Sequence, residues 1–202
     1  MVAQKYLTIS LACSVLFVDL LAYGVIIPLL PVYARTLEIT PGQIGLLFSS
    51  YWIAFFLALI PFGLVVDHYG TKNMIVGGMF LLFLCSTLYA FSSGMFLLAT
   101  SRTLQGVAAA CTWAAALPLA VQSTSETKRG LELSSVSLAI GLGTIMGPIL
   151  GGLGSVRTPL YLCAALALLL TIFCIIFLPN DQEKAISQEG KFARLLRHDN
   201  LQ

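Results

Sequence analysis

Two charged residues lie inside long apolar stretches of the chain, where a charge is energetically expensive. Asp19 is in the first such stretch and Arg102 is in the fourth. An ionisable side chain at the centre of a membrane helix costs about 2.5–3.5 kcal/mol on insertion scales, so it usually faces a cavity or a partner. A buried carboxyl can bind a proton or a cation, or it can serve only as a hydrogen-bonding lock between two helices. Asp19 is therefore the first candidate for chemistry, with both interpretations open.

The residues that share a helical face with Asp19 are small or polar. At 100° per residue, Thr8, Ala12 and Tyr23 fall with Asp19 inside an arc of about 60°, and the rest of the stretch is apolar. This narrow stripe predicts a helix that turns Asp19 toward the interior of a bundle and away from lipid.

Arg102 shares its helical face with Gly106, Ala109 and Trp113. Small residues allow helices to approach closely, and an arginine cannot discharge by losing its proton. Its guanidinium must therefore contact an anion or water, unless it extends to the lipid headgroups. Spans one and four begin on opposite sides of the membrane, so Asp19 and Arg102 can reach comparable depths. We expect the two charges to be coupled, because a close guanidinium favours an ionised carboxylate.

The fifth apolar stretch is rich in glycine, a composition that disfavours an isolated helix. Gly143, Gly147, Gly151 and Gly154 fall within about 80° of arc. They form a groove into which a neighbouring helix can press its backbone, and Pro148 predicts a bend. Helix packing alone is a common use of such a groove.

The elements that carry these residues follow from the composition. Of 202 residues, 58% are hydrophobic and 10% are charged, and the mean hydropathy of +0.91 excludes a soluble globule. The apolar runs are about twice as long as a barrel strand and do not alternate in polarity. We therefore predict an all-α integral membrane fold, a bundle of six transmembrane helices followed by a tail at residues 179–202. The predicted spans lie near residues 6–33, 43–66, 74–91, 95–121, 131–154 and 160–178.

Positive charge is distributed unequally between the two sides of this topology. Eight lysines and arginines fall on the side of the N-terminus, against Arg35 and Arg157 on the other side. By the positive-inside rule both termini are cytoplasmic, in a plasma membrane or a vesicle membrane. The tail suits a short amphipathic helix on the inner leaflet and equally a solvated linker. The eight residues are Lys5, Lys72, Lys128, Arg129, Lys184, Lys191, Arg194 and Arg197.

The composition also excludes several functional classes. A net charge of only +2 gives no indication of nucleic-acid binding. The five cysteines all lie in apolar runs, without a CxxC or a histidine spacing that would bind a metal, so we interpret them as packing residues. The chain has no Ser/His/Asp, Cys/His or paired-carboxylate set. We therefore expect neither an enzyme nor a bound cofactor or metal.

After the second span, Gly63, Asp67, Gly70 and Lys72 follow the spacing glycine-x3-aspartate-basic-x-glycine-basic-basic. This pattern resembles the cytoplasmic loop motif of the major facilitator superfamily, and more narrowly of its twelve-span drug:proton antiporters. The resemblance implies a conformational switch in which Asp67 pairs with loop cations and with a partner bundle. Capping of the following helix is the alternative role of this acid. Two motif positions that are usually basic are occupied here by His68 and Thr71.

Motifs in three other spans support the same resemblance. In the fourth span, Arg102, Gln105 and Gly106 resemble the motif whose arginine is assigned to proton coupling. Asp19 and the run from Gly24 to Pro31 resemble the motif of the first span. The fifth span resembles the motif associated with antiporters, formed here by Gly143, Gly147, Pro148, Gly151 and Gly152.

The first span and Trp113 look most like the vesicular-amine-transporter-like branch. The resemblance covers the whole chain but only the N-terminal half of such a transporter, whose six-helix halves are each a 3+3 inverted repeat. It implies a proton and substrate site at Asp19, Arg102, Tyr23, Gln105 and Trp113, and a fifth-span groove that seals the contact between the two bundles.

These observations predict half of a secondary active transporter that exports organic, cationic or amphiphilic solutes across a lipid bilayer in exchange for protons. One bundle cannot rock alone, so activity requires the missing C-terminal six-helix half or a homodimer. The rival prediction is a non-transporting six-span interaction or regulatory protein, or a truncated transporter fragment. Efflux that depends on a proton gradient distinguishes the two.

Overall fold

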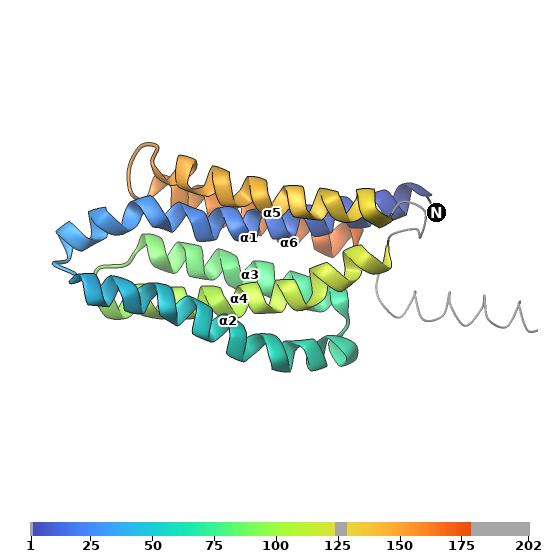
Figure 1. The fold of residues 1–202 in the computed structure, drawn as a ribbon, viewed down its shortest axis with the longest axis horizontal. Helices are drawn as coiled ribbons and strands as arrows, with labels where there is room; N and C mark the ends of the chain where they lie inside the picture. The colour runs from blue at the N-terminus through green and yellow to red at the C-terminus, as the bar shows by residue number, and fades with distance from the viewer. Residues whose placement is uncertain (1, 124–128, 179–202) are drawn as a thin grey trace, which may run out of the picture.

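The computed structural model describes residues 2–123 and 129–178, so the predicted tail at 179–202 lies outside the described residues. The described chain forms six α-helices that run back and forth in one elongated bundle (Figure 1). They are α1 (Val2–Thr36), α2 (Pro41–Tyr69), α3 (Thr71–Ala90), α4 (Met95–Gln122), α5 (Arg129–Gly151) and α6 (Thr158–Phe177).

Each of the six helices is long and apolar enough to cross a membrane. The residues that the structure describes include no strand, and the predicted all-α membrane class is confirmed. Helices suit this environment because their backbone hydrogen bonds are made within the segment, where lipid offers no partner. The chain is a multi-pass membrane protein.

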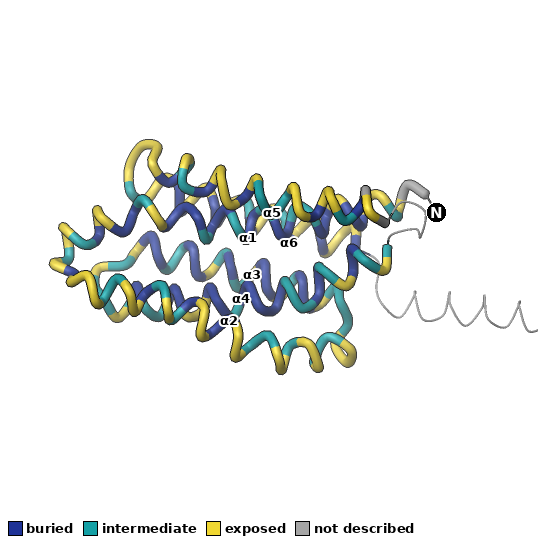
Figure 2. Tube along the Cα trace, viewed as in Figure 1, coloured by how far each residue is buried: buried dark blue, intermediate teal, exposed yellow. Residues whose placement is uncertain are grey.

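Helices α1 and α4 are the most buried, whereas α2 and α5 lie on opposite sides of the bundle (Figures 1 and 2). The membrane-spanning window is 61% buried in α1 and in α4, but only 11% in α2 and 17% in α5. α2 packs mainly on α4, and α5 packs mainly on α1. The two outer helices therefore present broad apolar faces that no described part of the chain covers.

The junction between α2 and α3 is shorter than the apolar pattern predicts. α2 continues through Asp67 and His68 to Tyr69, and Gly70 alone separates it from α3. Gly70 has a φ of 82°, a conformation that glycine adopts without steric cost. The gap predicted between residues 66 and 74 is thus reduced to one residue, because polarity marks the edge of an apolar span and not the end of a helix.

Three glycines of α5 allow α1 to approach closely. A Cβ atom added at Gly143 would lie 2.5 Å from the Phe17 carbonyl oxygen, and one at Gly147 would lie 2.7 Å from the Gly24 Cα. Gly151 meets the α1 backbone in the same way. The groove therefore holds a helix of the same bundle. The expectation that it seals a contact with a second bundle is wrong for these three glycines.

Two other glycines of the predicted set lie outside this groove. α5 ends at Gly151, and Gly154 lies in the connection to α6 with a φ of 77° and open space around it. Gly152 meets only carbonyl oxygens of α5 itself. The predicted arc assumed a regular helix through residue 154, whereas the chain turns before that point.

Replacing Gly147 by alanine should destabilise the bundle, because the new methyl group overlaps the α1 backbone. Overpacking of this kind costs about 1–3 kcal/mol. Gly152→Ala is the matched control, because its Cβ meets nothing closer than 3.5 Å, and it should stay within about 0.5 kcal/mol of wild type. Thermal unfolding in detergent measures both variants. Equal stability of the two would contradict the close α1–α5 packing.

Candidate functional site

The side chain of Asp19 lies inside the bundle, between α1 and α4. It is 1% exposed, and its Oδ2 accepts a hydrogen bond of 2.8 Å from Trp113 Nε1. Its Oδ1 has no hydrogen-bond partner among the described residues. Thr8 and Ala12 of the predicted stripe are buried as well. The carboxyl thus joins two helices and still keeps one oxygen without a partner.

Arg102 is fully buried and does not extend to the lipid headgroups. Its Nη1 donates a hydrogen bond of 2.8 Å to Gln105 Oε1, whereas its Nε and Nη2 have no partner in the described part of the chain. The guanidinium carbon lies 5.1 Å from the ring centre of Tyr23 and 5.4 Å from those of Phe48 and Tyr51. This is a cation–π arrangement. The alternative in which Arg102 reaches the membrane surface is wrong.

Aromatic side chains link Asp19 to Arg102, which form no ion pair with each other. Tyr23 follows Asp19 by one turn of α1, and its ring lies against the guanidinium. Trp113, the hydrogen-bond donor to Asp19, meets the ring of Phe55. Phe55 stacks on Tyr51 of α2, whose ring lies 5.4 Å from the guanidinium carbon. The rings of Tyr23 and Tyr51 pack with their centres 4.8 Å apart. The link between the two charges therefore runs through aromatic side chains.

An aromatic cluster, formed by Tyr23, Tyr51, Trp52, Phe55 and Trp113, borders the two charges. Trp52 Nε1 donates a hydrogen bond of 3.3 Å to Tyr23 Oη, and the rings of Phe55 and Trp113 meet edge to face at 6.0 Å. Trp52 is 42% exposed, so the cluster reaches the surface of the bundle. Sequence reasoning missed the three α2 members, because uncharged aromatic residues are common in membrane helices. The one feature of the sequence that could have indicated the cluster is the spacing of these three aromatic residues within five positions.

Gly106 brings α2 directly against α4 beside this cluster. A Cβ atom at Gly106 would overlap the carbonyl oxygen of Tyr51, so the two helices touch at the backbone. Close approach through a small residue is the usual way that membrane helices gain packing energy. The glycine of the span-4 motif therefore determines how near the α2 aromatic rings lie to Arg102.

Removing the ring of Tyr23 should cost far more stability than removing its hydroxyl. Tyr23→Ala leaves the guanidinium without its nearest ring and opens a gap, as in other aromatic truncations that cost about 3 kcal/mol or more. Tyr23→Phe keeps the ring and loses only the acceptor for Trp52, worth about 1 kcal/mol. Thermal unfolding of the two variants measures this difference. Equal losses would contradict the role of the ring.

The predicted switch residues lie at the end of the bundle where α1 begins (Figure 1). Gly63 and Asp67 are exposed on α2, and Lys72 lies in the first turn of α3. The N-cap of α3 is Gly70, and no side chain caps this helix. The alternative in which Asp67 caps the following helix is therefore wrong, and its pairing with a partner bundle stays a prediction.

The potential metal ligands are dispersed. Within residues 2–123 and 129–178, no three His, Cys, Asp or Glu side chains come together in a way that could hold a metal ion. The five cysteines are free thiols, and four of them are buried, namely Cys85, Cys111, Cys163 and Cys174.

Known proteins are similar to this chain in sequence and in fold. Residues 12–201 match the sequence profile of the Major Facilitator Superfamily. Multidrug resistance protein 1 of Bacillus subtilis is 29% identical over 191 residues, which cover 93% of this chain and 49% of the relative. An uncharacterised MFS-type transporter of Methanocaldococcus jannaschii is 31% identical over 160 residues, which cover 77% of this chain and 42% of the relative.

A solved structure shows the same arrangement of helices. The crystal structure of FucP, a transporter of the same superfamily in its outward conformation, matches with a TM-score of 0.69 over 86% of this chain and 50% of FucP. At 20% sequence identity, this likeness concerns the fold alone.

The chain spans about half the length of these relatives. Its six spans fit the N-terminal half of a twelve-span transporter, as the resemblance implied. The family profile covers nearly the whole sequence. This chain belongs to the major facilitator superfamily of membrane transporters.

Proposed function

We propose that this chain is the proton-binding half of an antiporter that exports organic cations or amphiphilic solutes in exchange for protons. The main support for this proposal is that two charged residues, Asp19 and Arg102, are buried beside the aromatic cluster. Neither of them has an ionic partner among the described residues. The similarity to a multidrug resistance protein supports the class of solute.

Asp19 is the residue at which proton and solute compete. An ionised carboxylate attracts a cation, and aromatic faces bind organic cations through cation–π contacts. A protonated carboxyl is neutral and is far less costly inside a membrane. Binding of a proton therefore displaces the cation, and binding of the cation displaces the proton. Exchange of this kind needs a carboxyl oxygen that the protein leaves unpaired, as Oδ1 is.

Arg102 supplies a fixed positive charge near this exchange site. It cannot release its proton, so its charge stays constant through the cycle. Gln105 and the rings of Tyr23 and Tyr51 hold it in place. When Asp19 is protonated, Arg102 disfavours a second cation nearby, and this repulsion promotes release of the solute.

A second six-helix bundle completes the transporter. Alternating access in such carriers is a rocking of one bundle against another around a site near the middle of the membrane. The apolar faces of α2 and α5 are exposed in this chain, and large exposed apolar surfaces mark contacts with protein or lipid. The second bundle is the remaining half of a longer transporter or a second copy of this chain. Both termini face the cytoplasm, in a plasma membrane or a vesicle membrane.

Transport in sealed vesicles tests the proposal. The transporter that contains this chain is reconstituted in liposomes, and movement of a fluorescent lipophilic cation is followed after a pH gradient is imposed. We expect the cation to move against the proton flow and to stop when a protonophore collapses the gradient. Movement that does not respond to the protonophore would contradict antiport.

A rival function is a six-span protein that regulates or assembles with full-length carriers. Binding of an organic cation separates the two proposals. A folded, membrane-inserted chain that binds no lipophilic cation, alone or with a second bundle, would support the rival.

A further inference from the structure

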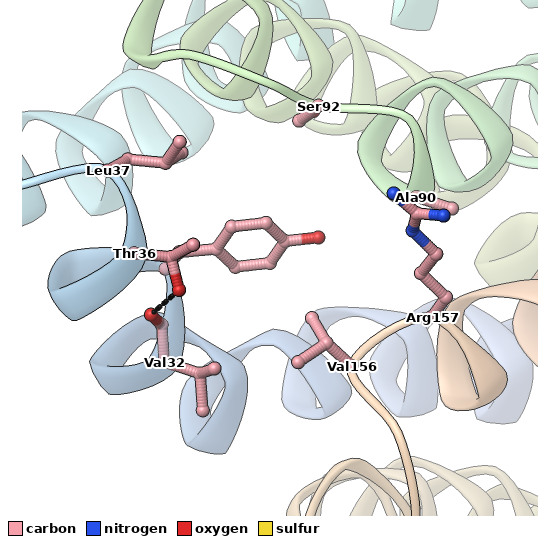
Figure 3. Close-up of a pocket in the computed structure, with 8 residues that line it drawn as sticks. Val32, Thr36, Leu37, Ala90, Ser92, Val156 and Arg157 are labelled. Carbon is pink, nitrogen blue, oxygen red and sulfur yellow. Dashed lines mark hydrogen bonds between the residues drawn. The ribbon is translucent and has the colours of Figure 1, made fainter.

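A second polar site lies at the opposite end of the bundle from the predicted switch residues, where α1 ends. A cavity of about 190 Å³ opens there between α1, the end of α3 and the connection from α5 to α6 (Figure 3). Its polar wall includes Tyr33, Ser92 and Arg157, and its apolar wall includes Val32 and Val156. None of these residues belongs to the aromatic cluster around Asp19.

Arg157 is the one charged side chain that lines this cavity. It directly precedes α6 and is exposed, and its guanidinium makes no ion pair or hydrogen bond with any residue that the structure describes. The nearest acid in the sequence of this region, Glu38, is exposed and does not line the cavity. The cavity therefore offers free guanidinium donors to an anion.

The hydroxyl groups of the cavity are less available than Arg157. Tyr33 Oη donates to the Tyr89 carbonyl oxygen at 3.3 Å, and Ser92 Oγ donates to the Leu88 carbonyl oxygen at 3.2 Å. These hydroxyl groups form a polar wall. Arg157 supplies the hydrogen-bond donors, because a planar guanidinium can donate two parallel N–H···O bonds to the oxygens of one phosphate.

The size of the cavity excludes a complete drug-sized ligand, whose pockets measure about 300–1,000 Å³. About 190 Å³ with one polar and one apolar wall suits the charged end of a longer amphiphile. Phe91 lies between the cavity-lining residues 90 and 92, and Tyr161 lies one helical turn after Arg157. Both are exposed, and their rings pack edge to face at 6.1 Å. Exposed aromatic residues at helix ends mark the headgroup level of a membrane. The cavity thus lies at the depth where lipid phosphates are found.

We propose that this cavity binds the phosphate group of an anionic membrane lipid, with Arg157 as the recognising residue. The apolar wall with Val32 and Val156 then lies beside the first part of the lipid tail. A bound lipid joins α1, α3 and the start of α6, so it stabilises this end of the bundle. The site is separate from the exchange site at Asp19 and does not depend on the proposed antiport.

Thermal unfolding of the purified full chain in detergent tests this proposal, with phosphatidylglycerol, phosphatidylcholine or inorganic phosphate added. We expect phosphatidylglycerol to raise the unfolding temperature of wild type by several degrees, and phosphatidylcholine to have little effect. Arg157→Gln should lose this shift, and Arg157→Lys should keep part of it. Arg35→Gln is the matched control, because Arg35 is an exposed cation on the last turn of α1 that does not line the cavity.

The outcomes separate the sources of phosphate. A shift that inorganic phosphate reproduces in full would overturn the lipid as the ligand and would assign the cavity to a free anion. A shift of equal size in wild type and Arg157→Gln would overturn the site itself.

Discussion

Replacing Asp19 by asparagine should abolish efflux driven by a pH gradient while the bundle stays folded. Asparagine has the size of aspartate and keeps an oxygen that can accept the hydrogen bond from Trp113 Nε1. It cannot exchange a proton, and it carries no charge to attract a cation. We expect the gradient-driven rate to fall by about 100-fold or more, the range seen when a positioned proton-transfer group is removed. Fluorescent-cation efflux from proteoliposomes measures the rate.

The matched control is Glu38→Gln, which removes an exposed carboxylate outside the site. This variant should transport at the wild-type rate. If Asp19→Asn retained efflux that follows the pH gradient, Asp19 would not be the exchange residue. The two variants should unfold at similar temperatures, so that a loss of transport cannot be assigned to a loss of fold.

Replacing Arg102 by methionine should also abolish gradient-driven efflux, but with no loss of stability. The guanidinium is buried without an anionic partner among the described residues, and two of its nitrogens make no hydrogen bond. Replacing buried ionic groups by apolar ones of similar volume is often neutral or stabilising by about 1–4 kcal/mol. Gln105 loses its hydrogen bond in this variant, so we expect a net gain of about 1 kcal/mol.

The Arg102→Lys variant tests whether transport needs only a positive charge at this position or also the planar guanidinium. Lysine keeps the positive charge but lacks the planar guanidinium that faces the rings of Tyr23, Phe48 and Tyr51. We expect partial efflux from this variant. A methionine variant that unfolds at a much lower temperature than wild type would show that Arg102 holds the bundle together, and it would contradict a role that is mainly in transport.

The burial of the two charges could be predicted from the sequence because the energies are large. A charge inside hydrocarbon costs several times the thermal energy, so Asp19 and Arg102 are predicted to avoid the lipid tails. For Arg102 the alternative was extension to the headgroups, which its complete burial excludes. The same energetic argument predicts the six spans, because long runs of uncharged apolar residues are stable inside a membrane. The contact of Asp19 with α4 through Trp113 could not be predicted, because helix spacing gives the face of a residue but not the neighbour that it meets.

The aromatic residues that α2 adds to the site could not be predicted from the sequence either. Tyr51, Trp52 and Phe55 cost little in a membrane helix, whichever way they point. Their position follows from the backbone contact at Gly106, which brings α2 against α4. The glycine spacing predicts a groove in α5 that a neighbouring helix can enter, but it does not say which helix, and the structure places α1 there.

Helices α2 and α5 have the exposed faces that a second bundle would cover in a transporter twice as long as this chain. Both helices are apolar, yet little of either is buried in the bundle. The proposed rocking motion requires such faces to contact a second bundle. The proposed exchange site lies between α1, α2 and α4, so under this proposal one bundle contains the residues that bind proton and cation, even where transport needs two.

Proton release on binding of an organic cation is the sharpest test of exchange at Asp19. The purified protein is placed in a weakly buffered solution with a pH-sensitive dye, at a pH where Asp19 is largely protonated, and a lipophilic cation is added. We expect wild type to release up to one proton for each cation bound and Asp19→Asn to release none. Binding of the cation by wild type without release of a proton, or equal release from the Asp19→Asn variant, would contradict exchange at Asp19.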